Sequence, residues 1–180
     1  MRILAQVEDS VLWLQESNAA FSENLRRQAE THGIAASRLI FAPRLPADKH
    51  LARMKLADLF LDTLPYNAHI TASDALFVGL PLVTCCGHAF PGRVAASLLH
   101  AIGLPELVTQ CLEDYERLTV TLALDRALLG SIREKLARNR TTAPLFDTGR
   151  FARQIEAAYT MMWERRGEPP DSFSIRAFSV

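Results

Sequence analysis

The 180-residue sequence lacks the features that mark several large classes of protein. Lysine plus arginine and aspartate plus glutamate each number 20, so the formal net charge is zero. A neutral chain offers no basic surface for nucleic acids or anionic membranes. No apolar run approaches the roughly 20 residues that a membrane span needs, and no secretory signal peptide opens the chain. We therefore expect a soluble domain that binds neither nucleic acid nor membrane.

Cysteine is also scarce, and its spacing excludes two kinds of cross-linked fold. The three cysteines are Cys85, Cys86 and Cys111. An odd number without Cys-x-x-Cys spacing fits neither a disulfide framework nor a zinc site. Three free thiols suit a reducing compartment, so we expect a cytoplasmic protein. We expect Cys85 and Cys86 to be small apolar residues at the end of a buried strand.

Several motifs of catalysis and cofactor binding are absent as well. The sequence has no glycine fingerprint of dinucleotide binders, no P-loop, no Ser/His/Asp nucleophile arrangement and no cluster of metal ligands. Internal repeats and low-complexity linkers are missing too. These absences argue against a nicotinamide enzyme, a P-loop nucleotidase and a metalloenzyme.

Short apolar runs alternating with amphipathic stretches are present along most of the chain. Residues such as Phe21, Leu25 and Ala29 recur at helical spacing between the runs. Strands that alternate with helices form a parallel sheet covered on both faces. The fold class predicted is therefore α/β, a doubly wound, Rossmann-like sheet. The expected strands cover residues 11–14, 39–42, 59–61, 82–85 and 106–108.

From Leu112 onward the pattern is helical only. Apolar residues at helical spacing indicate three further helices, around 112–122, 128–136 and 151–163. Residues 166–180 are expected to form a loosely ordered tail. The prediction is thus one α/β domain with extra helices at its C-terminal end.

Ligands of such sheets bind beyond the carboxyl ends of the strands, which directs attention to the loops at 43–46, 62–71 and 86–92. Segment 61–74 contains a strand end, a polar loop and the start of a helix at about Thr71. A helix start exposes unpaired N–H groups and a partial positive charge, so it binds phosphate. His69, Ile70 and Thr71 would present these groups to a diphosphate, and Asp74 could bind ribose hydroxyls.

These residue types also have structural explanations, which sequence spacing leaves open. Thr71 and Asp74 fit a Thr-x-x-Asp capping box that only satisfies the helix end. His50 and Arg53 could be ordinary surface residues of an amphipathic helix. Asp62 could be catalytic, but aspartate at the end of a strand is more often a turn former. His88, in a loop with glycine and proline, could approach a sugar or have no role.

Eight ordered segments of the chain form a recognisable series: SVLWL (10–14), RLIF (38–41), LAD (56–58), LDT (61–63), NAHIT (67–71), GLPLVT (79–84), RVAAS (93–97) and PLFDT (144–148). In this order they resemble blocks of the O-linked N-acetylglucosamine transferase family, which is related to SPINDLY. The resemblance runs from about residue 3 to residue 163. It implies a GT-B architecture, with two Rossmann-like lobes and the donor between them, and places residues 1–165 in the C-terminal, donor-binding lobe.

The resemblance also implies roles for single positions in nucleotide binding. The uracil would contact the Leu45 backbone, the His50 ring and Arg53. The diphosphate would lie on His69, Ile70 and Thr71, and the ribose on Asp74. Two positions depart from the pattern: Ile70 replaces a threonine, which removes one hydroxyl contact, and Ala47 replaces a lysine near the ribose, which removes a charge-assisted contact. Both departures would weaken binding without preventing it.

The activity implied is an inverting transfer of N-acetylglucosamine from uridine diphosphate to Ser or Thr of a protein, without a metal ion or other cofactor. The resemblance places the catalytic groups, the N-terminal lobe and substrate-recruiting tetratricopeptide repeats upstream of residue 1. We therefore expect this chain to be inactive alone. Its expected partners are the uridine nucleotide sugar, those upstream parts of the parent protein and the protein acceptors.

Three other functions remain open on the sequence alone. One is a non-catalytic interaction module that keeps the glycosyltransferase fold. Another is a fucosyltransferase lobe of the SPINDLY type, which would bind a guanosine diphosphate sugar. The third is a flavodoxin-like signalling domain, which predicts an acidic cluster at the strand ends that the sequence does not show.

Overall fold

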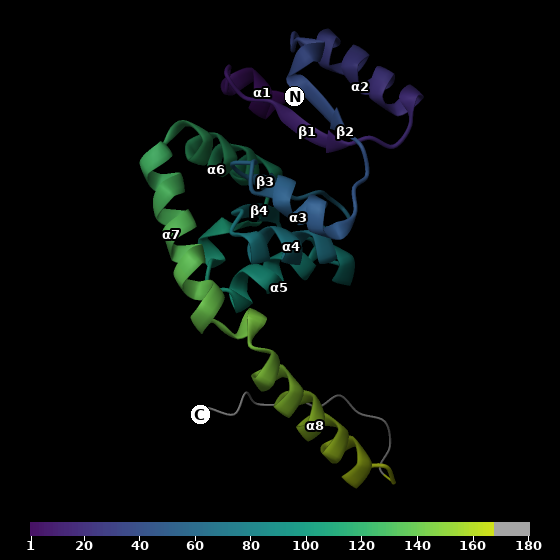
Figure 1. The fold of residues 1–180 in the computed structure, drawn as a ribbon, viewed down its shortest axis with the longest axis vertical. Coiled ribbons are helices and arrows are strands. Elements are labelled where there is room, and N and C mark those ends of the chain that lie inside the picture. Colours follow the sequence, from purple (N-terminus) through teal and green to yellow (C-terminus); the bar gives the residue numbers. More distant parts are fainter. Residues whose placement is uncertain (168–180) are drawn as a thin grey trace.

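A computed structural model describes residues 1–167 of the chain as alternating strands and helices followed by helices alone (Figure 1). The order of elements agrees with the sequence pattern. The elements are α1 (Arg2–Gln6), β1 (Leu12–Gln15), α2 (Ala19–Thr31), β2 (Leu39–Ala42), α3 (Ala47–Met54), β3 (Phe60–Leu61), α4 (Ile70–Val78), β4 (Leu82–Cys85), α5 (Val94–Ala101), β5 (Val108–Thr109), α6 (Leu112–Leu124), α7 (Arg126–Thr142) and α8 (Thr148–Glu164), with short 3-10 turns at Ala36–Arg38, Phe90–Gly92, Pro105–Leu107 and Pro144–Phe146.

All strand pairs are parallel, which confirms the predicted α/β class, and the strands divide into two sheets. Leu12 of β1 pairs with Leu39 of β2 in a two-stranded sheet. The other sheet has the order β3-β4-β5. Within residues 1–167 no ladder joins β1 to β3, and Figure 1 shows the first sheet with α2 set apart from the rest. Strand β3 has only two residues, so it offers too few backbone groups for a long second ladder.

The main core surrounds β4, whose four residues are all buried. A strand that is buried along its whole length, without alternation, is covered on both faces, as sequence analysis expected of a parallel sheet. Apolar side chains from four helices enclose it. These are Ala72 and Leu76 of α4, Ala95 and Leu99 of α5, Leu122 of α6, and Ile132 and Leu136 of α7.

Strand β5 differs from the prediction in its bounds, and strand β1 differs in its burial. Strand β5 covers Val108–Thr109 rather than 106–108, because Pro105 begins a 3-10 turn that ends at Leu107. Strand β1 is less buried than its apolar composition suggests, and Val11 before it is 58% exposed. The first sheet has only two strands, and its core contains few buried residues: Leu4, Ala29, Ile34 and Leu39.

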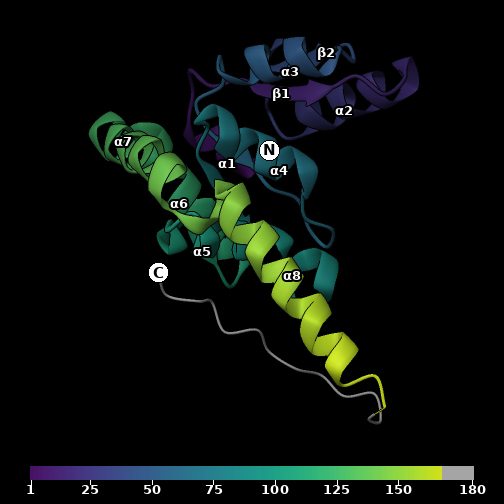
Figure 2. The same cartoon turned by 60° about the horizontal axis from the view of Figure 1, so that its bottom comes forward.

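The last helix, α8, buries none of its residues. Figures 1 and 2 both show it extending away from the rest of the fold. The predicted helical spacing is confirmed, but Phe151, Tyr159 and Trp163 are all more than half exposed. Of the predicted tail, Arg166 bonds the Trp163 carbonyl, and residues 168–180 lie outside the described residues. None of the helices in residues 1–167 combines the length and apolar character needed to cross a membrane.

Glycine ends α4, as the sequence predicts, and its backbone conformation explains why. Gly79 has a φ of 88°, in the left-handed region. This conformation lets the Leu80 amide bond the Ala75 carbonyl at 2.8 Å, which closes the helix end. Side chains with a Cβ are strained in this region.

We expect Gly79→Ala to lower the free energy of unfolding by about 1–2 kcal/mol, because alanine is strained at positive φ. Gly130→Ala is the matched control: Gly130 lies inside α7 with open space where a Cβ would be. There alanine should add about 0.5–1 kcal/mol through its higher helix propensity. Urea denaturation measures both. Equal stability of Gly79→Ala and the unmodified protein would refute the argument.

Candidate functional site

A buried carboxylate at the end of β3 organises the polar loop that follows. Asp62 is only 8% exposed. Its Oδ1 accepts a hydrogen bond from the Ala68 amide at 2.7 Å, and its Oδ2 accepts one from the Thr84 hydroxyl at 2.6 Å. The Tyr115 hydroxyl on α6 donates to the Asp62 carbonyl at 3.0 Å. Asp62 thus ties together its own loop, β4 and α6.

Burial sets the electrostatics of this cluster. It raises the pKa of Asp62 above its ordinary value, and hydrogen bonds from Thr84 and Ala68, with the nearby His69, oppose the rise. Burial also raises the pKa of Tyr115. Because both carboxylate oxygens already accept hydrogen bonds, Asp62 is a structural group rather than a free base. It is more than the turn former that its position in the sequence suggests.

The loop from residue 63 to residue 69 is held by its own polar side chains. The Thr63 hydroxyl donates to the Tyr66 carbonyl at 2.7 Å, and the Asn67 amide nitrogen Nδ2 donates to the Thr63 carbonyl at 2.9 Å. The Leu64–Pro65 peptide bond between them is cis. Asn67 is 1% exposed, and its Oδ1 has no hydrogen-bond partner among the residues that the structure describes.

The loop after β4 is hydrogen-bonded to the loop formed by residues 63–69. The Pro91 carbonyl accepts bonds from the Asn67 amide at 2.9 Å and from the His69 ring nitrogen Nε2 at 3.3 Å. A carbonyl only accepts, so Nε2 carries the proton and Nδ1 of His69 faces elsewhere. A Cβ on Gly92 would lie 3.0 Å from the Pro65 carbonyl oxygen, so the two backbones meet at a distance that favours glycine.

The start of α4 presents backbone amides without acceptors. The helix begins at Ile70, and its N-cap, His69, makes no side-chain cap. The first bond into the helix runs from the Ser73 amide to the His69 carbonyl at 3.1 Å. Within residues 1–167 no acceptor faces the amides of Ile70, Thr71 and Ala72. Ile70 is 78% exposed and Thr71 is exposed, so side chains do not seal this corner.

The position of the helix start rules out the capping-box interpretation. A capping box needs its threonine at the N-cap. The structure places Thr71 at the second helical residue and Asp74 at the fifth, with His69 as N-cap. Asp74 is half-buried, and among the described residues nothing forms a hydrogen bond or ion pair with its carboxylate. The capping hypothesis is therefore wrong, and Asp74 is free to bind a ligand.

The residues predicted to contact a base lie on α3 and the loop before it. Arg53 Nη1 donates to the Pro43 carbonyl at 2.6 Å, and its Nη2 lies 3.1 Å from the His50 ring nitrogen Nδ1. Its guanidinium also lies 5.5 Å from the centre of the Trp13 ring. Arg53 is thus no solvated surface charge. It fastens the loop that contains Leu45, which is half-buried.

Helix α3 packs beside α4, so the two groups of predicted residues belong to neighbouring helices. Met54 of α3 and Ala75 of α4 share a small buried cluster with Leu80. No hydrogen bond joins the His50 group to the α4 start within the described chain. Ala47 and His88 are exposed, and the structure records no hydrogen bond, ion pair or ring contact of His88.

Sequence reasoning missed an aromatic cluster beside the start of α4. The rings of Tyr66 and His69 stack with centroids 4.8 Å apart and an angle of 18° between their planes. Phe90 approaches His69 edge-on, at 6.2 Å. Aromatic residues inside two polar loops after neighbouring strands were the available signal. Asp62 and Asn67 were also missed as organising residues, because each has one partner that is distant in the sequence: Thr84 for Asp62 and Pro91 for Asn67.

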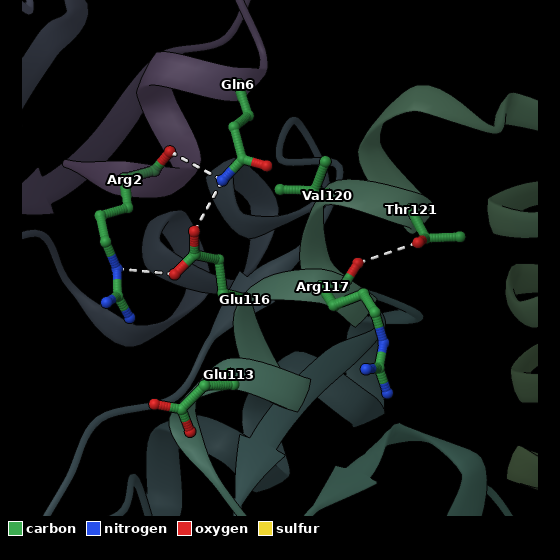
Figure 3. A pocket seen from close by; sticks show the side chains of 7 residues that line it. All are labelled: Arg2, Gln6, Glu113, Glu116, Arg117, Val120 and Thr121. Carbon is green, nitrogen blue, oxygen red and sulfur yellow. Dashed lines mark hydrogen bonds and ion pairs between the residues drawn. The ribbon is translucent and has the colours of Figure 1, made fainter.

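A cavity of about 310 Å³ lies elsewhere, between α1 and α6 (Figure 3). Its polar groups already bind one another: Arg2 Nε and Gln6 Nε2 each lie 2.6 Å from a different oxygen of Glu116. None of the residues predicted from the sequence lines it. We interpret it as the contact between α1 and α6.

In the described part of the chain, no three His, Cys, Asp or Glu side chains are grouped as metal ligands would be.

Comparisons with known proteins agree with one another. Residues 1–155 match the family described as Glycosyl transferase family 41. The chain is 36% identical over 176 residues to a probable UDP-N-acetylglucosamine–peptide N-acetylglucosaminyltransferase, SEC, of Arabidopsis thaliana. It is 34% identical over 165 residues to the UDP-N-acetylglucosamine–peptide N-acetylglucosaminyltransferase of Caenorhabditis elegans. These alignments cover 96% and 92% of this chain but 18% and 14% of the relatives, so the chain spans less than a fifth of their length.

A solved structure shows the same likeness in three dimensions. A mutant of the Thermobaculum terrenum O-GlcNAc transferase superposes with a TM-score of 0.84 and 34% sequence identity. The superposition covers 90% of this chain and 32% of that one. The resemblance inferred from ordered sequence blocks is thereby confirmed, together with the fold class.

We expect Asp62→Ala to lower the free energy of unfolding by about 2–3 kcal/mol, because it leaves the Ala68 amide and the Thr84 hydroxyl buried without a partner. Asp62→Asn should cost less, because its amide can accept from Ala68 and donate to the Thr84 oxygen. Urea denaturation at pH 7 ranks the three proteins. Equal losses in both variants would contradict the proposed bonding.

The difference in stability between the unmodified protein and Asp62→Asn should depend on pH. Because burial raises the pKa of Asp62, the folded state binds the proton of the Asp62 carboxyl group more tightly than the unfolded state does. The stability that the carboxyl contributes is therefore present below the unfolded pKa of about 3.9 and falls as pH rises through the folded pKa. The stability of the unmodified protein minus that of Asp62→Asn should decrease from pH 3 to pH 7. A constant or increasing difference would show the assigned direction to be wrong.

Proposed function

This chain belongs to glycosyl transferase family 41, and from that premise we propose that it is the donor-binding lobe of a protein O-linked N-acetylglucosamine transferase. Its donor would be uridine diphosphate N-acetylglucosamine, the nucleotide sugar in the names of the Arabidopsis and Caenorhabditis relatives. The reaction would be an inverting transfer to a Ser or Thr hydroxyl of a protein. Residues 1–165 would form the lobe, followed by a tail, in a cytoplasmic protein.

The observation that carries the proposal is the group of unpaired amides at the start of α4. Ile70 and Thr71 present N–H groups without acceptors, and both residues are exposed, so side chains leave this surface open. These groups and the helix dipole attract a diphosphate. When the bond to the sugar breaks, negative charge grows on the departing diphosphate, and preorganised donors stabilise it. The proposal therefore requires no metal ion.

Asp74 would hold the ribose. Its carboxylate lies one turn into α4 from the free amides and has no partner in the described chain. Two carboxylate oxygens can accept hydrogen bonds from neighbouring ribose hydroxyls, and bonds to a charged acceptor are stronger than neutral ones.

The base would lie towards α3. The Nδ1 atom of His50 accepts hydrogen bonds from Arg53, so its Nε2 carries the proton and remains a donor. The Leu45 backbone would bond the uracil edge. Ile70 and Ala47 each lack a polar contact that the family pattern provides, which makes the site a weaker version of that pattern.

The groups that activate the acceptor would lie in parts of the parent protein beyond this chain, in an N-terminal lobe and in tetratricopeptide repeats that recruit protein acceptors. The chain spans 18% and 14% of two curated relatives and 32% of the solved transferase, which supports this division. Binding of the nucleotide and turnover are then separate properties, and only the first belongs to these residues.

We expect Asp74→Ala to weaken uridine diphosphate binding roughly 10- to 100-fold, the loss of about 1.5–3 kcal/mol of hydrogen bonding to a charged group. Calorimetry measures the affinity. Since Asp74 caps nothing and alanine favours helices, the variant should be at least as stable as the unmodified protein. Glu134→Ala, an exposed carboxylate on α7, is the control and should leave affinity unchanged. Unchanged affinity in Asp74→Ala would refute the ribose role.

Thermal shifts with uridine and guanosine diphosphate test the identity of the base, because a true ligand stabilises the folded state by mass action. Stabilisation by the uridine nucleotide alone is the expected result. Preference for the guanosine nucleotide would instead support a fucosyltransferase lobe of the SPINDLY type. Stabilisation by neither would support a non-catalytic interaction module.

Incubated with uridine diphosphate N-acetylglucosamine and a Ser-rich acceptor peptide, the 180-residue chain should show no transfer above background. The physical reason is that diphosphate binding alone neither positions the acceptor hydroxyl nor removes its proton. Mass spectrometry of the peptide detects the product. Turnover by this chain would contradict the assignment of the catalytic groups to other parts of the protein.

A further inference from the structure

Two large aromatic rings lie exposed beside the free amides of α4. Tyr66 is 62% exposed and Phe90 is 72% exposed. Both contact His69, the residue immediately before Ile70: Tyr66 stacks on its ring and Phe90 meets it edge-on. Exposed aromatic groups next to polar groups that converge on one spot are typical of ligand sites.

The loops hold these rings in place. The Tyr66 carbonyl accepts the Thr63 hydroxyl, and the Asn67 amide that follows is bonded to the Pro91 carbonyl. The His69 ring, which supports Tyr66 from one side, is itself bonded to Pro91. The aromatic surface is therefore preorganised, and a ligand that binds to it need not order a flexible loop first.

We propose that Tyr66 and Phe90 form a platform for the hexosyl ring of the donor, an inference that rests on the proposed function. A pyranose ring carries C–H groups on its faces and hydroxyls around its edge, so its apolar face packs on an aromatic ring. The exposed ring surface of Tyr66 and the edge contact of Phe90 offer such a surface, and water is displaced from both partners.

The position of the platform selects the hexosyl group over the base. His69 joins the two parts of the site, because its ring supports Tyr66 and it is the residue immediately before the helix whose first amides are free. A diphosphate on those amides has one substituent directed towards α3, where His50 and Leu45 lie. The other substituent is then directed towards the loops after β3 and β4. In a nucleoside diphosphate sugar, these substituents are the nucleoside and the hexose.

Tyr66 thereby becomes a residue that distinguishes the sugar nucleotide from the free nucleotide. Substitution of its ring should leave the diphosphate amides, Asp74 and His50 untouched. It should therefore act on the hexose alone. A residue with only a structural role would change both affinities together.

The test compares uridine diphosphate with uridine diphosphate N-acetylglucosamine on the 180-residue chain. We expect Tyr66→Ala to weaken binding of the sugar nucleotide five- to tenfold relative to the free nucleotide, about 1–1.4 kcal/mol in their ratio. Tyr66→Phe keeps the ring and should keep the ratio. Phe90→Ala should shift the ratio in the same direction. Hexose C–H protons should move upfield on binding to the unmodified protein and not to Tyr66→Ala.

Tyr159→Ala is the matched control, since Tyr159 is 65% exposed but lies on α8. It should change neither affinity. If the unmodified protein binds neither nucleotide, the proposed function fails and the platform fails with it. If uridine diphosphate binds but the ratio stays constant in both Tyr66→Ala and Phe90→Ala, the platform is refuted and the donor lobe stands. Loss of folding in Tyr66→Ala, seen as a lowered melting temperature, leaves Phe90→Ala and the proton shifts to decide.

Discussion

The hydrogen bonds of the buried Asp62 carboxylate determine where α4 begins, and the candidate site depends on that position. Strand β3 has only two residues, so its ladder with β4 cannot by itself orient the eight residues that separate it from the helix. Asp62 supplies the missing constraint by accepting from Ala68 and from Thr84 at once. A carboxylate is suited to this role because its two oxygens serve partners in different segments. The desolvation that raises its pKa is the cost of that geometry.

Two separate sets of hydrogen bonds hold the loop that precedes α4. Asp62 holds the loop after β3 from inside, while the Pro91 carbonyl holds it from the loop after β4. The two loops also approach closely at Gly92, where an added Cβ would lie 3.0 Å from the Pro65 carbonyl oxygen. Backbone amides remain unpaired only when the neighbouring loop is held in place, because a flexible loop would fold back and accept their hydrogen bonds. The unpaired amides of Ile70 and Thr71 are therefore a property of the whole corner rather than of α4.

Local patterns predicted much of the fold, and long-range hydrogen bonds account for most of what they missed. Apolar periodicity located α2, α6, α7 and α8, a short apolar run located the buried strand β4, and Gly79 marked the end of α4, because these signals depend on neighbouring residues. The capping box at Thr71 and Asp74 failed because a hydrogen bond outside the helix determines where the helix starts. Its spacing is correct, but the bond from Ala68 to Asp62 places the helix start at Ile70. The division into two sheets was also beyond local pattern, since it depends on which strand edges find partners.

The contacts of Arg53 in the structure differ from the role that the sequence resemblance implies for it. Resemblance implies a contact with the base, and the structure places Arg53 on α3, which packs beside α4. Its guanidinium, however, donates to the Pro43 carbonyl and to His50. Those bonds hold the loop that carries Leu45 and orient the His50 ring, the two other groups assigned to the base. In the proposed function Arg53 thus acts on the nucleotide through its neighbours. It reaches the two acceptors from different nitrogens of a planar fork, whereas a lysine would have to bring a single nitrogen within bonding distance of both.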